Sequence, residues 1–448
     1  MTFAVRSSLA LLALAPSLAR AQRADTAKLH AQIDKGVTAV MPQVVAWRRD
    51  IHQHPELGNR ETRTAALVAA QLKSLGMEVR TGVGYTGVVG VLKGGKPGPV
   101  VALRADMDAL PVTEMVDLPF KSTVKTQYNG QEVGEMHACG HDNHVAILLG
   151  TATVLAGMRA DLPGTVLFIF QPAEEGPPEG EEGGAALMLK QGAFANPAPD
   201  AVFGLHVWPN AVGHLDTRPG ALMASAAGLK IVVHGKQTHG AQPWRGVDPI
   251  VVASQIVLGL QTIASRQLDL RRGTAVITVG AINGGNRGNI IPDSVVMIGT
   301  IRTFVRGMDK EIAERVTREA QSIAAGAGAT ADVKVDGGYA PTINDARLVA
   351  QMTPTLKRVG GSNVDTDVTP VTPSEDFSDY AEKVPGMFFF LGIVPEGQDP
   401  ATAAPNHSPY FFADEKALPV GVRAMTSLAV DFLASGGLKQ TSAAAGGR

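Results

Sequence analysis

One stretch of ten residues constrains this chain more than any other: residues 135–144, with the sequence EMHACGHDNH. It contains the only cysteine of the 448-residue chain and three of its 11 histidines. Cys139 precedes His141 by two residues, so a thiolate and an imidazole can reach one point, and this donor pair suits zinc and similar metals better than calcium or magnesium. The alternative is a polar turn that opens a helix, with Cys139 as a small buried hydrophobic residue and the histidines bonded to the backbone. The metal hypothesis therefore requires further ligands elsewhere in the chain.

Length and composition indicate a globular protein of two or three domains. The chain has 45% hydrophobic and 18% charged residues, which is ordinary for a protein that buries a large core. The formal net charge is -2. Because no run of basic residues is interleaved with aromatic ones, the sequence argues against nucleic acid as a partner.

The first 21 residues have the pattern of a secretory signal peptide. Arg6 supplies the positive charge, Leu9–Ala15 is an apolar run too short to span a bilayer, and Ala19–Ala21 is a small-x-small cleavage signal. We expect cleavage after Ala21 and export to the periplasm or out of the cell, with no membrane association of the mature chain. The alternative is an uncleaved anchor. A single cysteine allows no internal disulfide, so metal coordination would protect the exported thiol from oxidation.

Acidic residues follow two predicted buried strands. Pro99–Leu103 leads to Asp106 and Asp108, and open α/β sheets place their active sites just past the carboxyl ends of such strands. The alternative role for these two aspartates is the capping of a turn or helix. Thr165–Phe170 leads in the same way to the adjacent residues Glu174 and Glu175.

Two adjacent glutamates can divide the work of metal-assisted hydrolysis. One can bind a metal while the other takes a proton from water. The alternative is a solvated acidic loop, which is the expected state of the next acidic residues, Glu179, Glu181 and Glu182. A further apolar strand, Ala201–Val207, contains His206, which is either a bonded core histidine or another ligand.

The pattern changes between about Leu222 and 340. Strands at Leu229–His234, Thr274–Ile282, Ser294–Thr303 and Ala331–Val335 alternate with helices at Asp248–Leu268 and Asp309–Gly326. This β-α-β-β-α-β order is typical of a ferredoxin-like α+β domain. We therefore predict an α/β catalytic domain with a mainly parallel sheet flanked by helices, formed by residues 22–221 and 341–436, with residues 222–340 inserted and a flexible tail at 437–448.

Nine motifs, taken in order, resemble the M20 metallopeptidase family. They are HQHPELGNRE, RADMDALP, HACGHDNH, FQPAEE, GLHVWP, THGAQPW, NIIPD with GTIRT, SEDFS and NHSP. The series is most similar to the amidohydrolase branch with hippurate hydrolases, N-acyl-amino-acid amidohydrolases and auxin-conjugate hydrolases. The resemblance spans roughly residues 40–436. It implies a catalytic domain with two divalent metals, zinc or manganese, and an inserted lid domain that forms a homodimer.

The resemblance also implies roles for individual residues. It makes Glu174 the general base and gives five metal ligands: Cys139, His141, Glu175, His206 and His407. On the lid, it implies that His239 helps to stabilise the oxyanion, and that Asn289 and Arg302 contact a substrate carboxylate. Asp106 and His144 are candidates for supporting the ligands by hydrogen bonds. The remaining histidines stay structural or unassigned: His52, His54, His137, His214 and His234.

The expected activity is hydrolysis of the amide bond of N-acyl amino acids by water activated between the metals. Three alternatives remain open. The same fold could serve a carboxypeptidase acting on dipeptides or peptide C-termini, the chain could be a non-catalytic exported carrier of a metal or ligand, or Cys139 could act as a thiolate nucleophile. Two departures from the family pattern bear on acyl preference: Pro373 replaces a glycine, and Pro177-Pro178 lies in the acidic loop after the base.

Overall fold

The computed structural model describes residues 10–439, with side chains from residue 26 onward. The chain divides into two units, each of which is considered by itself. The larger comprises Met1–Pro219, Asp345–Val368 and Glu382–Arg448, and the smaller comprises Gly220–Asn344 and Thr369–Ala381. The turn at Ser374–Asp376, which the sequence places in the catalytic domain, therefore groups with the smaller unit.

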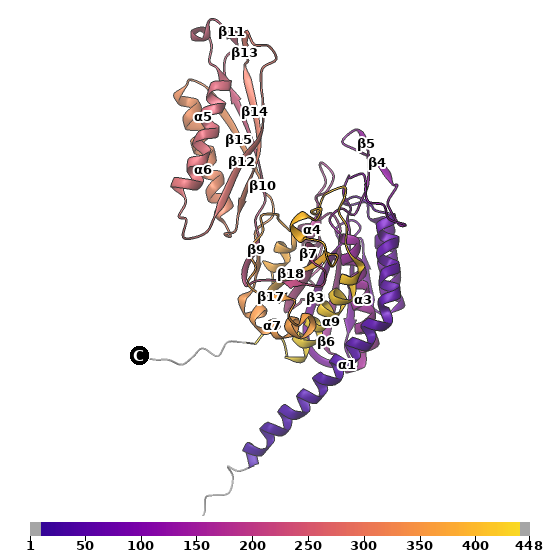
Figure 1. Cartoon of the computed structure of the whole chain (residues 1–448). Coiled ribbons are helices and arrows are strands. Elements are labelled where there is room, and N and C mark those ends of the chain that lie inside the picture. Colours follow the sequence, from indigo (N-terminus) through magenta and orange to yellow (C-terminus); the bar gives the residue numbers. More distant parts are fainter. Residues whose placement is uncertain (1–9, 440–448) are drawn as a thin grey trace, which may run out of the picture. The chain divides into compact units, whose positions relative to one another are not determined.

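The larger unit is built on an eight-stranded sheet (Figure 1). Its strands follow the order β1 (Glu78–Thr81), β2 (Val88–Lys93), β6 (Pro163–Gln171), β3 (Lys96–Asp106), β7 (Ala201–Ala211), β18 (Gly386–Val394), β8 (Leu215–Asp216) and β17 (Val364–Asp365). The central pairs β6–β3, β3–β7 and β7–β18 are parallel, whereas β1–β2, β2–β6 and β18–β8 are antiparallel. All nine residues of β18 are buried, as expected of a strand covered on both faces. The predicted α/β class is confirmed.

Helices pack against this sheet and supply most of the core. They are α1 (Ala10–Gln53), α2 (Thr62–Ser74), α3 (His141–Gly157), α4 (Gly184–Lys190), α7 (Ala346–Gly360) and α9 (Leu418–Ala434). Helices α1, α3 and α9 pack against one another, and α3 is buried over most of its length. Among the described residues, only Glu415–Ala434 is long and apolar enough to cross a membrane, judged by length and composition alone. Since 72% of the tested window is buried inside the protein, this segment behaves as a core helix.

The smaller unit has the β-α-β-β-α-β order that the sequence predicts. The elements are β10 (Ala227–His234), α5 (Pro249–Thr262), β12 (Ala275–Asn283), β14 (Ser294–Thr303), α6 (Met308–Gly326) and β15 (Thr330–Asp336). They form an antiparallel sheet of order β12-β14-β10-β15, and alternate residues of β10 are buried in the core under the helices. Strands β11 (Thr238–His239) and β13 (Ile290–Ile291) pair at one end of this unit (Figure 1). Short segments β9 (Gly220–Met223), β16 (Thr342–Asn344) and α8 (Phe377–Ala381) complete it.

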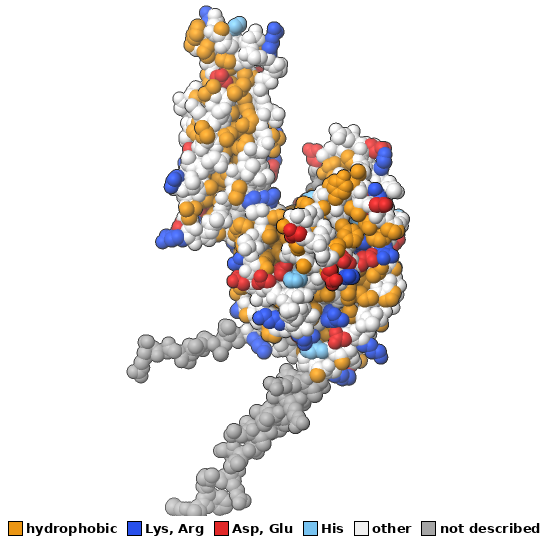
Figure 2. All heavy atoms as spheres, in the orientation of Figure 1, with side chains coloured by type: hydrophobic (Ala, Val, Ile, Leu, Met, Phe, Trp, Pro, Cys, Tyr) orange, Lys and Arg blue, Asp and Glu red, His pale blue; other side chains and the backbone are white. Residues whose placement is uncertain are grey.

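Hydrophobic side chains also appear on the surface of the smaller unit (Figure 2). Leu258 on α5 is 72% exposed and Ile298 on β14 is 51% exposed.

Two local features differ from the sequence expectations. The hairpin of β4 (Lys125–Tyr128) and β5 (Gln131–Gly134) was not predicted, because its strands are polar and mostly exposed. Its turn, Asn129-Gly130, has positive φ at both residues, and this Asn-Gly pair was the available signal. The helix expected through Leu268 ends as α5 at Thr262 and continues as one π-helical turn, Ile263–Gln267. Residues 1–9 of the predicted signal peptide and residues 440–448 of the predicted tail lie outside the described residues.

The central strand β3 offers a test of the packing. Leu103 is fully buried in the core of the larger unit. We expect Leu103→Ala to lower the free energy of unfolding by about 2–5 kcal/mol, because it removes buried methyl groups and leaves a cavity. Leu103→Met, which nearly preserves volume, should cost less than about 1.5 kcal/mol. Urea denaturation of the two variants checks this, and equal losses would contradict the packing argument.

Candidate metal centre

The carboxyl ends of three neighbouring strands bring the predicted site residues of the larger unit together. Asp106 is the last residue of β3, Glu174 and Glu175 follow the end of β6, and His206 lies in β7 next to β3. Cys139 and His141 lie immediately before and at the start of α3. The parallel arrangement places all these side chains at one edge of the sheet, where α/β proteins bind their ligands.

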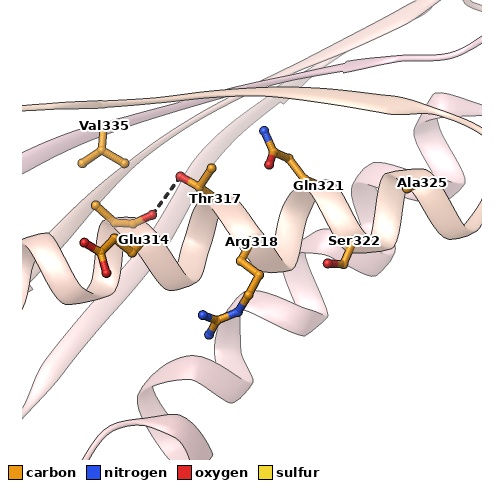
Figure 3. A pocket seen from close by; sticks show the side chains of 8 residues that line it. Glu314, Thr317, Arg318, Gln321, Ser322, Ala325 and Val335 are labelled. Carbon is orange, nitrogen blue, oxygen red and sulfur yellow. Dashed lines mark hydrogen bonds between the residues drawn. The ribbon is translucent and has the colours of Figure 1, made fainter.

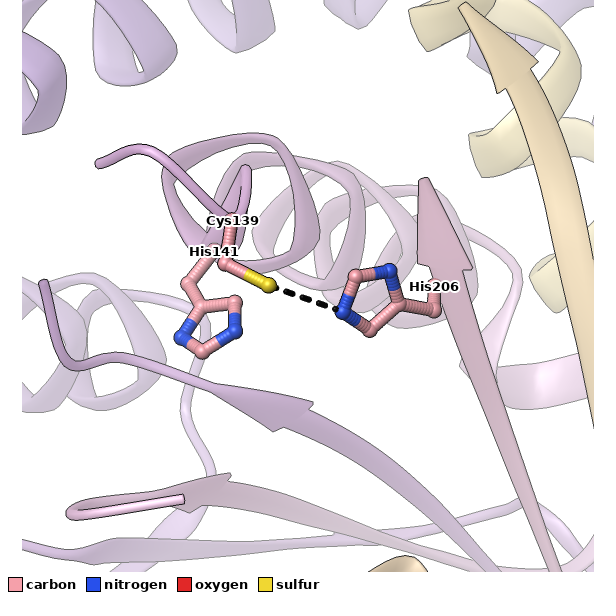
Figure 4. A group of neighbouring side chains, drawn as sticks. All are labelled: Cys139, His141 and His206. Carbon is pink, nitrogen blue, oxygen red and sulfur yellow. Dashed lines mark hydrogen bonds between the residues drawn. The ribbon is translucent and has the colours of Figure 1, made fainter. Parts of the chain in front are cut away.

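Cys139, His141 and His206 form the first group of possible ligands (Figure 4). Their donor atoms lie within 4.8 Å of one another, and all three residues are buried. The Sγ of Cys139 is 3.4 Å from Nε2 of His206. The Nδ1–H of His206 donates to the carbonyl oxygen of Val207 at 2.7 Å. This hydrogen bond leaves the lone pair of Nε2 directed towards the sulfur, the tautomer that a metal ligand needs.

Glu175 and His407 complete the set and share Cys139 with the first group. The Nε2 of His407 is 3.0 Å from Oε1 of Glu175, and Nε2 of His141 is 3.9 Å from the nearest carboxylate oxygens of both Glu174 and Glu175. His407 has φ of 71°, a conformation that non-glycine residues adopt mainly at constrained sites. The five side chains predicted as ligands thus face a common space, with Glu174 beside them.

The charges around His141 favour a cation. Burial alone would lower the pKa of His141, but Asp106, Asp108 and Glu175 raise it to about 10. Burial raises the pKa of the Cys139 thiol well above its usual value, and Glu175 and Glu174 raise it further. A thiolate nucleophile is disfavoured by this environment, since it would need a positive charge nearby.

The donor atoms fit divalent metal ions. The Nδ1 of His141 hydrogen-bonds Oδ1 of Asp108 at 3.2 Å, and its Nε2 has no hydrogen-bond partner among the described residues. A neutral imidazole would present this lone pair to carboxylates, which is unfavourable unless a cation lies between them. Sulfur, imidazole nitrogen and carboxylate oxygen are the donors that zinc and its neighbours accept.

Asp106 and His144 support the site through hydrogen bonds, and with His141 they also form a group that could hold a metal ion. His144 Nδ1 hydrogen-bonds Asp106, and its Nε2 accepts the backbone N–H of Val207 at 2.9 Å. Arg104 donates to Asp106 at 2.6 Å. Burial would raise the pKa of Asp106, but His141, His144 and Arg104 hold it well below its usual range. Asp106 therefore remains a carboxylate and contributes negative charge near His141.

Two further residues organise the centre: Asp108, which the sequence indicates only as an acidic residue after a buried strand, and Asn406, which was not singled out. Asp108 joins two parts of the site, because it accepts from His141 and from the backbone N–H of Glu175 at 2.9 Å. Asn406 donates from Nδ2 to the carbonyl oxygen of Cys139 at 3.1 Å, next to the ligand His407. Their positions in the RADMDALP and NHSP motifs, two residues from Asp106 and one from His407, were the available signals.

The three predicted lid residues do not lie together in the smaller unit. His239 and Asn289 are neighbours, since the N–H of Gly240 donates to the carbonyl oxygen of Asn289 at 2.8 Å. Arg302 lies eight residues along β14 from Ser294, a distance of about 27 Å in an extended strand. Its guanidinium donates to Oγ of Ser374 at 3.0 Å. The structure thus shows contact between the segments of His239 and Asn289, and places Arg302 next to Ser374.

His52 belongs to a buried ion network beside the site. Its Nδ1 is 2.9 Å from Asp142 and its Nε2 is 3.0 Å from Glu114, and Arg48 is also 2.9 Å from Asp142. Both ring nitrogens of His137 are buried without a hydrogen-bond partner among the described residues, and burial lowers its pKa to about 3. The other unassigned histidines, His54, His214 and His234, lie outside the possible metal-binding groups found among the described residues.

Pockets are also found away from the five proposed ligands. One of about 720 Å³ runs along α6 of the smaller unit and is lined by residues such as Glu314, Arg318 and Val335 (Figure 3). None of the predicted site residues lines it. Another, of about 750 Å³, is in the larger unit between the β4–β5 hairpin and the loop at Gly176–Glu179. The second therefore adjoins the segment that carries Glu174.

Comparisons with known proteins match nearly the whole chain. The sequence profile described as Peptidase family M20/M25/M40 matches residues 102–431. Thermostable carboxypeptidase 1 of Saccharolobus solfataricus is 40% identical over 406 residues, which cover 90% of this chain and 98% of that protein. IAA-amino acid hydrolase ILR1-like 2 of Arabidopsis thaliana is 39% identical over 88% of this chain and 87% of its own length.

Two further proteins resemble the chain closely. N-acetylcysteine deacetylase of Bacillus subtilis is 38% identical over 87% of this chain and 96% of its own length. The crystal structure of the Bacillus subtilis YXEP protein, described as a dinuclear metal-binding peptidase of the M20 family, has a TM-score of 0.72 and 35% sequence identity, covering 88% of this chain and 99% of that one. The fold of the chain is thus that of a protein described as binding two metals.

Gly140, between two predicted ligands, provides a test of the site's geometry. It has φ of 89°, and a Cβ there would lie 2.3 Å from a methyl group of Val207. We expect Gly140→Ala to displace Cys139 and His141 and to reduce bound metal by at least half, because both the backbone conformation and the contact become unfavourable. Gly130→Ala is the matched control: its φ is 76° but nothing lies within 4 Å. Elemental analysis of both purified variants checks this, and native metal content in Gly140→Ala would contradict it.

Proposed function

The chain belongs to peptidase family M20/M25/M40, as its motifs predict, and from this premise we propose that it hydrolyses the amide bond of N-acyl amino acids with Glu174 as the general base. It is a metal-dependent hydrolase acting on amide bonds, in common with its relatives. The single observation that carries the proposal is the convergence of the five side chains proposed as metal ligands on one space, with the buried Glu174 beside them.

The proposed ligands are Cys139, His141, Glu175, His206 and His407. Two of the groups they form share Cys139, which supports a site for two divalent ions. When bound, such ions lower the pKa of a water molecule and polarise a carbonyl group. Zinc or manganese is the proposed metal, because the donor set combines one thiolate with imidazoles and a carboxylate.

Glu174 supplies the proton transfers in this proposal. Its carboxylate takes a proton as water oxygen bonds to the amide carbon, and it gives that proton to the nitrogen as the C–N bond breaks. The products are a carboxylic acid and a free amine. Asp108 keeps His141 oriented and holds the N–H of Glu175, so the segment around Glu174 is fixed before substrate binds. His239 is proposed to offset negative charge on the carbonyl oxygen.

The proposed substrate class combines an acyl group with an amino acid that has a free carboxylate. The names of two relatives, an IAA-amino acid hydrolase and an N-acetylcysteine deacetylase, support this class. Arg302 is the proposed partner of the carboxylate, since a guanidinium can donate two parallel hydrogen bonds to it. The carboxypeptidase from Saccharolobus solfataricus favours the second candidate, cleavage of dipeptides or peptide C-termini.

A homodimer is proposed from the smaller unit. His239 and Asn289 lie beside each other, whereas Arg302 donates to Ser374, so the proposal is that two copies of this unit contribute to one active site. Export through the signal at residues 1–21 remains a proposal from the sequence pattern alone.

Replacement of Glu174 tests the proposed base. We expect Glu174→Gln to lower kcat for an N-acyl amino acid by about 10²–10⁴-fold, because an amide cannot accept the proton. Metal content should stay native, since Glu174 is not a proposed ligand. Glu179→Gln, an exposed carboxylate of the same loop, is the matched control and should retain native kcat. Full activity in Glu174→Gln would end this assignment.

A substrate panel separates the two candidate functions. We expect N-acyl amino acids to give a higher kcat/KM than dipeptides, and C-terminal amides to lose at least about 10-fold, because a hydrogen bond to a charged group contributes about 1.5–3 kcal/mol. Chelation should abolish hydrolysis. Faster cleavage of dipeptides would favour the carboxypeptidase. No hydrolysis of any substrate would favour a metal carrier. Activity that resists chelation but is lost when Cys139 is alkylated would favour a thiolate nucleophile.

A further inference from the structure

Glu61 is a fully buried carboxylate that no step of the proposed mechanism uses. It directly precedes α2, yet its side chain makes no capping hydrogen bond to that helix. Its Oε1 instead accepts the backbone N–H of Ala173 at 2.9 Å and that of Asn59 at 3.1 Å. Its Oε2 accepts the hydroxyl of Thr86. One side chain thus connects three segments that are far apart in the sequence.

Another glutamate stabilises the start of α2. Glu56 accepts the backbone N–H groups of Arg63 and Thr64, both at 2.8 Å, and the hydroxyl of Thr62. These are N–H groups that have no partner within the helix, and Glu56 satisfies them. Glu61 is therefore not required for the helix, so its burial needs a different explanation.

The contact with Ala173 bears directly on the proposed base. Ala173 precedes Glu174, is fully buried, and has φ of 52°, a conformation that is costly for a residue with a Cβ. On the other side of Glu174, the N–H of Glu175 donates to Asp108 at 2.9 Å. The backbone is thus held by a buried carboxylate immediately before and immediately after Glu174.

The segment that precedes α2 packs against the same loop. A Cβ at Gly58 would lie 2.8 Å from the carbonyl oxygen of Gly176 and 3.1 Å from Cβ of Ala173. Asn59 donates from Nδ2 to the carbonyl oxygen of Glu182 and to the carboxylate of Glu181, both at 3.0 Å. Glu181, expected from the sequence to be solvated, is therefore part of this contact. The loop after β6 is fixed from one side by residues 58–61.

We propose that Glu61 is a positioning residue for the catalytic loop: it holds the left-handed backbone at Ala173 and so fixes the direction of the Glu174 side chain. This inference rests on the proposed role of Glu174 as general base. The side chain at position 61 must be long enough to place an acceptor oxygen next to the Ala173 N–H. It does not need a negative charge. A displacement of about 1 Å in a catalytic group can lower a rate by about 100-fold.

The surroundings of Glu61 agree with an uncharged acceptor. Burial and the nearby Asp108 raise the pKa of Glu61 to about 8, although the hydrogen bonds from Thr86 and the backbone oppose this shift. A glutamine has the same length, and its amide oxygen can accept from both Ala173 and Asn59. Its NH₂ group can donate to the hydroxyl oxygen of Thr86. An aspartate keeps the carboxylate but is shorter by one methylene.

Two variants of the full-length metal-loaded protein distinguish the effect of side-chain length at position 61 from the effect of its charge. We expect Glu61→Gln to retain kcat within threefold of native, and Glu61→Asp to lose at least 10-fold in kcat with KM changed less than threefold. Metal content and Tm are measured alongside, and kcat is expressed per metal-loaded site. A loss in Glu61→Gln as large as in Glu61→Asp, or native kcat in Glu61→Asp, would overturn the proposal.

Glu56→Ala is the matched control for a purely structural effect. It removes the carboxylate that stabilises the start of α2 and should lower Tm without lowering kcat per metal-loaded site. If Glu61→Asp lowers only Tm, as this control does, then Glu61 is structural and the proposal fails.

Amide hydrogen exchange provides a readout that does not depend on the reaction. In the chelated protein, the peptide spanning residues 171–176 should exchange at least 10-fold faster in Glu61→Asp than in Glu61→Gln, because the Ala173 N–H loses its acceptor. Equal exchange would overturn the positioning role. Faster exchange in Glu61→Asp together with full activity in Glu174→Gln would support the contact between Glu61 and the loop but refute Glu174 as the base. Failure of the Glu61 proposal can therefore be distinguished from failure of the proposed base.

Discussion

The structure of the candidate site depends on the electrostatics of carboxylates gathered around His141. Asp106, Asp108, Glu174 and Glu175 all approach this imidazole at the buried edge of the sheet. In a region of low dielectric such a group of negative charges repels itself unless cations are present. Arg104 reduces part of this repulsion because its guanidinium forms an ion pair with Asp106. The remaining negative charge is what a metal-dependent hydrolase uses to hold its ions.

The backbone of the site is held in uncommon conformations by these same groups. Gly140, Ala173 and His407 all have positive φ, and each lies in, or next to, the segments that carry the predicted ligands. Such conformations are stable only where the surrounding structure fixes them. Here Glu61 and Asp108 fix the segment after β6, and Asn406 fixes the segment with His407 to Cys139. A rigid backbone keeps the ligands in place before metal or substrate arrives.

The sequence predicted the elements whose residues alternate or repeat with a regular period. The buried strands β3, β6 and β7 and the β-α-β-β-α-β order of the smaller unit were recognised because apolar runs and helical spacing are local signals. The hairpin β4–β5 was missed because its strands are polar. The five proposed ligands were named from motifs, but their proximity could not be read from spacing, since they are spread from Cys139 to His407.

The sequence by itself determined the class of fold, the family and the kinds of donor atom available, because local residue patterns and residue types are enough to indicate each of them. Only the tertiary structure decided which carboxylates hold the backbone. Glu56 and Glu61 are both glutamates near the start of one helix, yet the first satisfies the N–H groups of that helix and the second satisfies the N–H of Ala173, 112 residues away. The physical reason is that a buried N–H takes whatever acceptor the folded chain brings near it, and sequence distance carries no information about that.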